Sequence, residues 1–570
     1  MTSPAEVPLS HGDTYGSRSW VFALAVSAGI ALLLVSPFFW RGNASGHDIS
    51  FHASSWLDAA GQWKEGILYP RWTEWANYGF GEPRFIFYPP LSWMLGAALS
   101  LVLPGNAVPG TFIFLVQTAA GLSMFVLARR FFAIPAAVFS AACYAANPYA
   151  LLIIYMRSDF AELLASAFLP ALLLAALQVS GLIENRFRSV ARAMAIFALL
   201  FAAVWLSNAP AGVMASYGMA LLFAWAALRK KSLRPFVSGC SGLALGLALA
   251  CFYLVPAAYE QRWVNIAGAL ASGLQPSQNF LYREINDPEH NVFNWIASSV
   301  AVLLKLLTWI AAVLTYRSVK DAHASREEKE LWPVLILLGG VATFLMLRPS
   351  EILWEQLPKL RFVQFPWRWM GTLALPYACL GAAVVAQRRA AWIWGLLVAV
   401  AIAGTGVFLV KKAWWDSDDI PSLQDAIANG QGFDGSDEYD PSGDDHYNLP
   451  QNAPQVQVLP AGGSGLAPRA EIRLQRWTAE DKEIRVYSRE PLRLALRLLN
   501  YPAWRVTVNE QLVMPEAPEG TSQVILRLPS GSQHVALRFA RTPDRSLGSL
   551  LSGISLLALM VAFWRSPPIK

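Results

Sequence analysis

The chain has 570 residues, of which 55% are hydrophobic and only 15% are charged, and its formal net charge is +6. A soluble globular domain is nearer to a quarter charged, so the composition excludes an ordinary soluble protein. The excess of basic residues lies in short loops between apolar runs, so we expect no nucleic-acid partner.

Apolar runs of about 18–22 residues recur along the chain, and each is long enough to cross roughly 30 Å of hydrocarbon. The runs are continuous rather than alternating, which predicts helices and not the strands of a barrel. Twelve membrane spans are predicted near residues 20–40, 108–128, 133–150, 162–183, 193–207, 210–228, 235–257, 294–315, 332–347, 366–386, 391–410 and 546–564.

The distribution of Lys and Arg orients these spans. If the N-terminus is cytoplasmic, the basic clusters, such as Arg129–Arg130 and residues 229–234, all fall in inside loops, as the positive-inside rule requires. The apolar run Leu91–Leu103 is too short to span, so we expect it to lie along the outer interface as an amphipathic helix. The outer side then holds a long first loop, 41–107, and a large region, 411–545.

The C-terminal outer region divides into two parts. Residues 411–454 are acidic and show no clear periodicity, which predicts a long linker loop, ordered or partly disordered. From residue 455 to 545, short alternating apolar runs are separated by turn-forming residues, which predicts a β-sandwich. Residues 546–570 form the last span and a tail.

The first outer loop is dense in acidic, basic and aromatic side chains, and Asp48 follows the first span closely. A carboxylate just above the membrane can act as a general base on a substrate carried by lipid. Alternatively, Asp48 opens an interfacial helix as its N-cap. His47 and His52 flank it, but a spacing of five is not a helical ligand pair, so hydrogen bonding to Asp48 or to a phosphate is favoured over a metal.

A second acidic cluster contains Arg157, Asp159 and Glu162. One interpretation is structural: Asp159 caps the fourth span and Glu162 lies in its first turn, where the helix dipole favours negative charge. The functional interpretation places all three in the same cavity as Asp48, where they bind sugar hydroxyls or a divalent cation.

A third segment, residues 360–369, enters the tenth span and contains Arg361, Gln364 and Arg368. Arg suits phosphate binding, and Arg368 lies at the level of a lipid phosphate. The alternative is an aromatic belt with a snorkelling Arg. In the first loop, further candidate substrate-binding residues are Arg71, Trp72, Glu82 and Tyr88.

These motifs resemble a known family. The chain contains GHDISFHASSW, NYGFGEPRFIFYPPLSW, RSDFAELL, LRFVQFPWRW, SDEYDP and NYPAWRVTVN. This set resembles bacterial membrane proteins called 6-pyruvoyl-tetrahydropterin synthase-related, which are similar to the YfhO-like family and to the GT-C glycosyltransferase superfamily. The chain has no three-histidine zinc site of a pterin synthase.

The resemblance implies a polytopic α-helical, GT-C-like transmembrane domain over residues 1–410, followed by the extracytoplasmic β-sandwich. It implies Asp48 as the catalytic base, with Asp159 and Glu162 as an acidic site in the second outer loop. The donor would be a polyprenyl-phosphate sugar, transferred with inversion to a glycan, lipid or protein acceptor. Mg or Mn is an optional cofactor, held by Asp48, Asp159 and Glu162.

We therefore expect a glycosyltransferase in a bacterial cytoplasmic membrane, with its active site on the extracytoplasmic side. Two other classes stay open. A transporter or flippase of lipid-linked sugars would place ionisable residues and broken helices near the midplane and often show repeated halves, whereas these spans hold few charges and no repeat. A non-catalytic envelope scaffold would use the β-sandwich to recruit a partner.

Overall fold

The computed structural model describes residues 17–564 apart from 187–188, 321–324, 388–390, 442–445, 463–464, 517 and 519. Within these residues, ten helical segments are long and apolar enough to cross a membrane. Their main helices are α1 (Ser17–Val35), α7 (Val108–Ala128), α8 (Ile134–Ala145), α10 (Phe160–Val179), α11 (Val190–Ser207), α12 (Ala209–Lys230), α15 (Pro288–Lys320), α18 (Met370–Ala386), α19 (Ala391–Lys412) and α21 (Pro543–Trp564).

Two further helix pairs pass the same test but are bent. They are α13 (Arg234–Leu249) with the helical segment Cys251–Trp263, bent by 74°, and α16 (Arg326–Leu345) with the segment Arg348–Gln356, bent by 93°. Counting each pair as one span gives twelve in the described chain, so the prediction of a polytopic helical membrane protein is confirmed.

The bend after α13 was not predicted, because residues 235–257 read as one continuous helix. Its cause lies in the last span: the Ser552 hydroxyl accepts the Phe252 N–H at 2.8 Å and lies 3.1 Å from the Ala248 carbonyl oxygen, to which it donates. An uninterrupted helix would join this N–H and this carbonyl directly. A side chain that inserts into the helical ladder in this way produces a kink.

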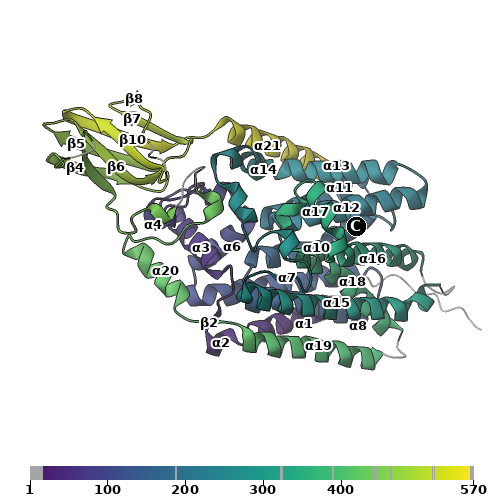
Figure 1. The fold of residues 1–570 in the computed structure, drawn as a ribbon. Helices are drawn as coiled ribbons and strands as arrows, with labels where there is room; N and C mark the ends of the chain where they lie inside the picture. Colours follow the sequence, from purple (N-terminus) through teal and green to yellow (C-terminus); the bar gives the residue numbers. More distant parts are fainter. Residues whose placement is uncertain are drawn as a thin grey trace, which may run out of the picture.

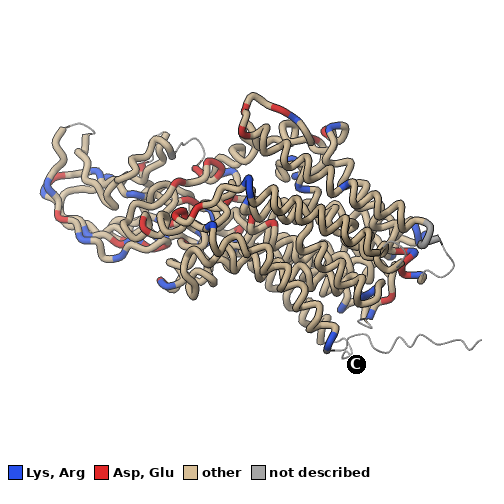
Figure 2. The backbone as a smooth tube through the Cα atoms, turned by 90° about the horizontal axis from the view of Figure 1, so that it is seen from below, with Lys and Arg blue, Asp and Glu red and all other residues tan. Residues whose placement is uncertain are grey.

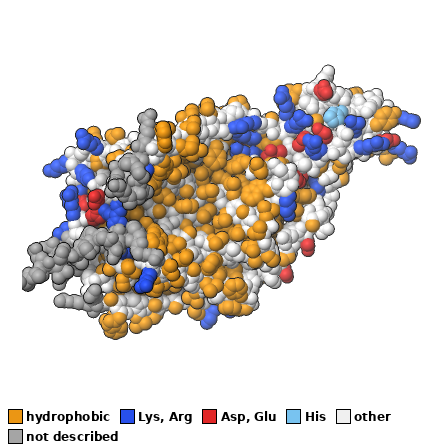
Figure 3. All heavy atoms as spheres, turned by 180° about the vertical axis from the view of Figure 1, so that it is seen from behind, with side chains coloured by type: hydrophobic (Ala, Val, Ile, Leu, Met, Phe, Trp, Pro, Cys, Tyr) orange, Lys and Arg blue, Asp and Glu red, His pale blue; other side chains and the backbone are white. Residues whose placement is uncertain are grey.

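The spans run side by side, and the β-domain projects from one end of the bundle (Figure 1). Charged residues gather in the β-domain, at the bundle end beside it and in the loops at the opposite end, while the helices between carry few (Figure 2). Seen from behind, the bundle presents a broad apolar surface (Figure 3). Such a surface suits a hydrocarbon environment.

The first long loop folds against the bundle instead of extending away from it. Its helices are α3 (Ile49–Lys64) and α6 (Pro90–Ser100), and they pack closely together. Gly96 of α6 lies against the ring of Trp56, because a Cβ at this position would come within 2.2 Å of the indole Nε1. With 11 residues, α6 is too short to span a membrane, as predicted, and its position along the outer interface stays a prediction.

The C-terminal β-domain has two antiparallel sheets with a shared apolar core that includes Ile484, Leu494, Leu526 and Val535. The prediction of a β-sandwich is confirmed. The five-stranded sheet has the order β4 (Ala470–Trp477), β5 (Asp481–Ser488), β10 (Gly531–Phe539), β7 (Trp504–Val508), β8 (Gln511–Leu512). The three-stranded sheet has the order β3 (Val456–Pro460), β6 (Leu492–Leu499), β9 (Gln523–Leu528).

The acidic linker contains a strand and a helix that its sequence did not predict. It begins with β2 (Trp415–Asp416), which pairs with β1 (Asn43–Ala44) after the first span. It continues as helix α20 (Asp419–Ala428), whose buried residue Ile420 lies against Gly105. Tertiary packing thus stabilises a helix in a segment whose composition favoured a loop.

A buried ion pair joins the β-domain to the bundle. Glu260, at the end of α14 (Cys251–Glu260), is fully buried and binds the Arg545 guanidinium of α21 through both oxygens, at 2.7 and 2.9 Å. The Tyr501 hydroxyl of the β-domain donates to the same carboxylate at 2.6 Å.

Candidate functional site

Two distant segments are joined backbone to backbone at the end of the bundle next to the β-domain. The Asp48 N–H donates to the Arg157 carbonyl at 2.9 Å, and the Gly46 N–H donates to the Ser158 hydroxyl at 3.0 Å. Gly46 is required for this approach, because a Cβ there would lie 2.6 Å from the Met156 carbonyl oxygen. The sequence hypothesis that Asp48 and the second acidic cluster lie together therefore has a geometric basis.

The second segment interrupts the helical path. A π-helical turn, Ile153–Arg157, ends at Ser158, whose φ is +55°, and α10 starts at Phe160. The loop between these spans is therefore only two residues long, whereas the predicted spans 133–150 and 162–183 left residues 151–161 between them. Single π turns are frequent at functional sites, because the extra residue redirects the side chains that follow.

Asp159 is the N-cap of α10, as the structural interpretation predicted, and it also lines the cavity beside Asp48; its role in binding a substrate stays a prediction. Its Oδ1 accepts the Glu162 N–H at 2.9 Å. Its Oδ2 lies 3.3 Å from Arg368 Nη2 and 3.9 Å from Arg157 Nη2. Asp48 differs: it occupies the N-cap position of α3, but its side chain makes no capping bond.

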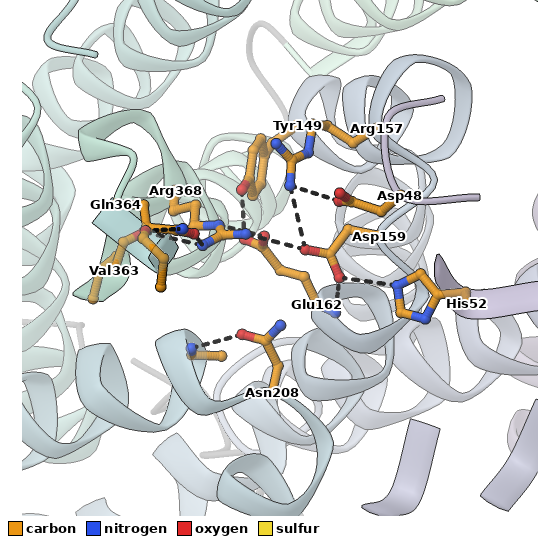
Figure 4. A network of polar contacts seen from close by, with 12 residues as sticks. Asp48, His52, Tyr149, Arg157, Asp159, Glu162, Asn208, Val363, Gln364 and Arg368 are labelled. Carbon is orange, nitrogen blue, oxygen red and sulfur yellow. Dashed lines mark hydrogen bonds and ion pairs between the residues drawn. The ribbon is translucent and has the colours of Figure 1, made fainter. Parts of the chain in front are cut away.

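The Asp48 carboxylate instead accepts a hydrogen bond from Arg157 Nη2 at 2.6 Å. Arg368 Nε lies 3.2 Å from Glu162, and the Tyr149 hydroxyl donates to the same carboxylate. The result is a continuous chain of acidic and basic groups from Asp48 through Arg157, Asp159 and Arg368 to Glu162 (Figure 4).

The three carboxylates of this network differ in how much of each side chain is exposed to solvent. The side chain of Asp48 is 31% exposed, whereas those of Asp159 and Glu162 are 5% and 6% exposed. Three carboxylates face two guanidinium groups, so the network carries an excess negative charge when all three are ionised. That charge is accommodated most easily on Asp48, the carboxylate that water reaches.

Arg368 is fixed by its own segment. Its Nη1 donates to the Val363 carbonyl at 3.0 Å and to the Gln364 side chain at 3.1 Å. Gln364 has a φ of +66° and donates from Nε2 to the Ala269 carbonyl at 2.7 Å, which fixes the turn that precedes α18. Arg368 is therefore a rigid part of the wall.

A cavity of about 680 Å³ opens beside the network. Of the predicted site residues, those that line it are His47, Asp48, Tyr88, Arg157, Asp159, Gln364 and Arg368. His52 and Glu162 do not line it. They lie behind: His52 Nε2 is 3.8 Å from Asp159, and Glu162 is covered by Arg368.

The other walls of the cavity come from segments that the sequence did not single out. Glu289 and His290 come from the first turn of α15, which begins earlier than predicted, and Asp287 directly precedes this helix. Glu438 and Tyr439 come from the acidic linker, and the Tyr439 ring stacks on Phe87 at 5.7 Å. The motif SDEYDP, noted only for its resemblance, was the available signal for these two residues.

The local environment shifts the pKa values of two side chains that line the cavity, His47 and Glu438. Burial and the nearby Arg157 lower the pKa of His47, which favours a neutral imidazole. Burial raises the pKa of Glu438 to about 7, so this carboxyl group is partly protonated at neutral pH.

Four candidate substrate-binding residues lie away from the cavity. Trp72 is buried under the β-domain against Trp504 and Phe539. Glu82 is fully buried, bound to Arg84 at 2.6 Å and to the Ser436 N–H at 2.9 Å.

The two arginines among them also point elsewhere. Arg71 lines a different pocket, beneath the β-domain. Arg361 is exposed, because its neighbours Leu360 and Val363 take the buried side of the short turn. For Arg71, Trp72 and Glu82, sequence proximity to Asp48 was a poor guide, since the first loop folds back between the β-domain and the bundle.

The three carboxylates do not fit a metal ion as they are arranged. The Arg157 guanidinium lies between Asp48 and Asp159, and Arg368 bridges Asp159 and Glu162. No group of three or more acidic, His or Cys side chains with the geometry of a metal site occurs among the described residues. A divalent cation would require the arginines to move, so no step below is assigned to one.

The fold and site define a polytopic membrane protein with a charged cavity at one end of its helical bundle. A family model described as "6-pyruvoyl-tetrahydropterin synthase related domain; membrane protein" matches residues 85–413, more than half of the chain, and the protein belongs to this family. The matched region contains Arg157, Asp159, Glu162 and Arg368, whereas Asp48 precedes it. None of the curated proteins matches the sequence.

Three of the solved structures with a weak likeness to this chain are the following. Arabinofuranosyltransferase AftD from Mycobacteria shares 16% identity at a TM-score of 0.41, over 69% of this chain and 27% of that one. The oligosaccharyltransferase of Archaeoglobus fulgidus shares 15% at 0.39, over 69% and 55%. ArnT from Cupriavidus metallidurans, bound to undecaprenyl phosphate, shares 12% at 0.30, over 74% and 90%. This chain thus spans about a quarter of the length of the arabinofuranosyltransferase and about half of the length of the oligosaccharyltransferase.

Proposed function

We propose that the protein is a GT-C type glycosyltransferase that transfers a sugar from a polyprenyl-phosphate donor to a glycan, lipid or protein acceptor. The observation that supports this most is the pairing of Asp48 with Arg157 at the wall of the cavity. A partly hydrated carboxylate beside a guanidinium provides the two groups this reaction needs, a base for the acceptor and a cation for the leaving phosphate.

In the proposed reaction, Asp48 accepts the proton of the acceptor hydroxyl. The acceptor oxygen bonds to the anomeric carbon, and the bond from that carbon to the phosphate oxygen breaks. The electron pair of that bond leaves on the polyprenyl phosphate. A single displacement of this kind inverts the anomeric centre.

Arg157 is the better candidate for contacting the donor phosphate, because Arg368 is engaged by Val363, Gln364, Asp159 and Glu162. Arg157 is also the partner of Asp48. A phosphate that draws Arg157 towards itself would release the Asp48 carboxylate from its hydrogen bond, so that its oxygens could accept a hydrogen bond from the acceptor hydroxyl. Donor binding and base activation are linked in this proposal.

Asp159 and Glu162 act as positioning residues in this proposal. Both are buried, and they hold Arg368 from two sides. His52 in turn lies 3.8 Å from Asp159, and Tyr149 bonds to Glu162. We assign Asp48 alone to proton transfer, because Glu162 does not reach the cavity.

We further propose that the cavity and the β-domain face the extracytoplasmic side of a bacterial cytoplasmic membrane. The short loops at the opposite end of the bundle carry basic residues such as Arg129, Arg130, Lys230 and Lys231. The positive-inside rule places such loops in the cytoplasm. The β-domain would then be available to position an acceptor.

The test is Asp48→Asn in protein reconstituted into liposomes with radiolabelled decaprenyl-phosphate hexoses and pentoses and a panel of glycan, lipid and peptide acceptors. We expect transfer to fall by at least roughly 100-fold, with the unfolding temperature unchanged. Asp425→Asn, at an exposed position of α20, is the matched control and should keep full activity.

Transfer that survives Asp48→Asn would refute the role of Asp48. Movement of labelled lipid across the bilayer without formation of any glycoside would favour a flippase. If the protein neither transfers sugar nor moves lipid, and its β-domain binds an envelope partner, the scaffold would be favoured.

A further inference from the structure

A second pocket lies where the β-domain, the first loop and the last span meet. We call it the junction pocket. It has a volume of about 490 Å³ and is separate from the cavity beside Asp48. Its lining residues include Tyr69, Arg71, Phe252, Glu480, Arg541 and Arg545.

The junction pocket concentrates guanidinium groups. Arg71 Nη1 is buried, and no hydrogen-bond partner for it lies among the described residues. The Arg71 guanidinium lies over the Tyr69 ring at 4.3 Å, a contact that provides no oxygen acceptor for Nη1. Burial lowers the pKa of Arg71, which an anion bound beside it would counteract. A buried donor without an acceptor indicates a missing ligand or water.

Two more arginines complete the basic wall. Arg545 is neutralised by Glu260, and Arg541 is exposed at the rim. Glu480 is the one carboxylate among the described lining residues, and its Oε1 already accepts the Arg71 backbone N–H at 3.0 Å. The described lining residues thus include three arginines and one glutamate; because Glu260, outside the lining, neutralises Arg545, Arg71 and Arg541 remain against Glu480, and this excess of positive charge attracts an anion.

The position of the junction pocket indicates where that anion comes from. Ser549 and Ser552 of α21 line it, and Ser552 lies about 14 Å along the helix from Pro543 at its start. Phe252 and Phe539 provide apolar wall. The pocket therefore extends from the β-domain into the apolar part of the last span. Basic side chains are visible where the apolar surface meets the β-domain (Figure 3).

We propose that the junction pocket binds the phosphate of a membrane-lipid head group, with Arg71 and Arg541 as its ligands and the acyl chains lying along α21 and Phe252. Arg binds phosphate oxygens with charge-assisted, often bidentate hydrogen bonds. The bound lipid would fasten the β-domain to the bilayer beside the Glu260–Arg545 pair. This inference does not depend on the proposed transferase activity.

The experiment measures lipid binding to the full-length protein in nanodiscs and by native mass spectrometry after mild detergent extraction. The probe is fluorescent phosphatidylglycerol, competed with unlabelled phosphatidylglycerol or with inorganic phosphate. Arg71→Gln with Arg541→Gln should weaken binding by at least about tenfold, because two charge-assisted hydrogen-bonding groups are lost. The matched control, Arg473→Gln with Arg505→Gln, alters two exposed arginines of the outer strand faces and should bind like the wild type.

Arg541→Gln alone is the second variant, since this exposed residue can be changed without affecting folding. It should weaken lipid binding several-fold with an unchanged unfolding temperature. Equal binding by the wild type and both arginine variants would overturn the proposal. Full displacement of the lipid by millimolar inorganic phosphate would also overturn it, because the pocket would then be a site for a soluble anion.

Discussion

Two buried clusters of arginine and carboxylate lie at the same end of the bundle, and they differ in one respect. The Glu260–Arg545 pair is closed: one carboxylate meets one guanidinium through two bonds, and Tyr501 adds a third. The cavity network is open: it has one carboxylate more than it has guanidinium groups, and Asp48 is 31% exposed.

The closed pair has no capacity left for a ligand, so its role is structural. The open network keeps a carboxylate whose single strong partner, Arg157, faces the same cavity. Burial of charge is common to both clusters. Incomplete pairing next to a cavity is what distinguishes the cavity network, and it is the feature that the proposed proton transfer and phosphate binding would use.

The largest effect is expected from Arg368→Met. It leaves Asp159 and Glu162 buried without their shared partner, which should destabilise the protein by about 3–5 kcal/mol and abolish transfer. Apparent unfolding temperature in detergent and transfer in liposomes measure the two effects. A variant that unfolds like the wild type would show that the network does not depend on Arg368.

A similar loss of stability, without a specific loss of chemistry, is expected from Arg545→Met. Removing one partner of a buried pair costs about 3–5 kcal/mol, whereas removing both is often nearly neutral. Arg545→Met with Glu260→Gln should therefore regain most of the lost stability. Folded protein of either variant should keep wild-type transfer rates. A double variant no more stable than Arg545→Met would contradict the assignment of a closed pair.

The smallest expected effect on stability comes from another buried carboxylate, Asp58 of α3. Unlike the carboxylates of the two clusters, it accepts its hydrogen bonds from neutral donors. Gln62 Nε2 lies at 2.6 Å and the Trp75 N–H at 2.9 Å. Burial raises the pKa of Asp58 to about 6. Its contribution to stability is fully present below the unfolded pKa near 4 and is lost as pH rises through 6.

Unfolding temperature measured from pH 4 to pH 7 tests this. The wild type should lose stability over this range through Asp58, by up to about 3 kcal/mol for a shift of this size. Asp58→Asn should show a flatter profile, because the amide does not titrate. Parallel profiles for the two proteins would show that Asp58 is ionised throughout.

The helical bundle with its membrane spans and the β-sandwich could be predicted, because apolar length and strand alternation are local properties of the sequence. The association of Asp48 with the second acidic cluster could be suspected, because the predicted spans place both segments at the same end of the bundle. The partners could not be predicted: the Asp48–Arg157 bond depends on backbone contacts between residues more than 100 positions apart.

The misplaced residues show the same limit. Trp72 and Glu82 occur in the loop that contains Asp48, yet they pack under the β-domain and against the linker. The kink at Phe252 is set by Ser552, a residue of another span. Side-chain contacts between distant elements decide such features, and no pattern within one segment records them.

The π-helical turn Ile153–Arg157 has a consequence for how insertions and deletions would act on this protein. Such a turn holds one residue more than an α-helical turn. Deleting a single residue there would restore the regular helix and rotate Arg157 by about 100° around the helix axis, away from Asp48. The correct alignment of the cavity wall therefore depends on the length of the chain at this point as much as on the identity of its charged side chains.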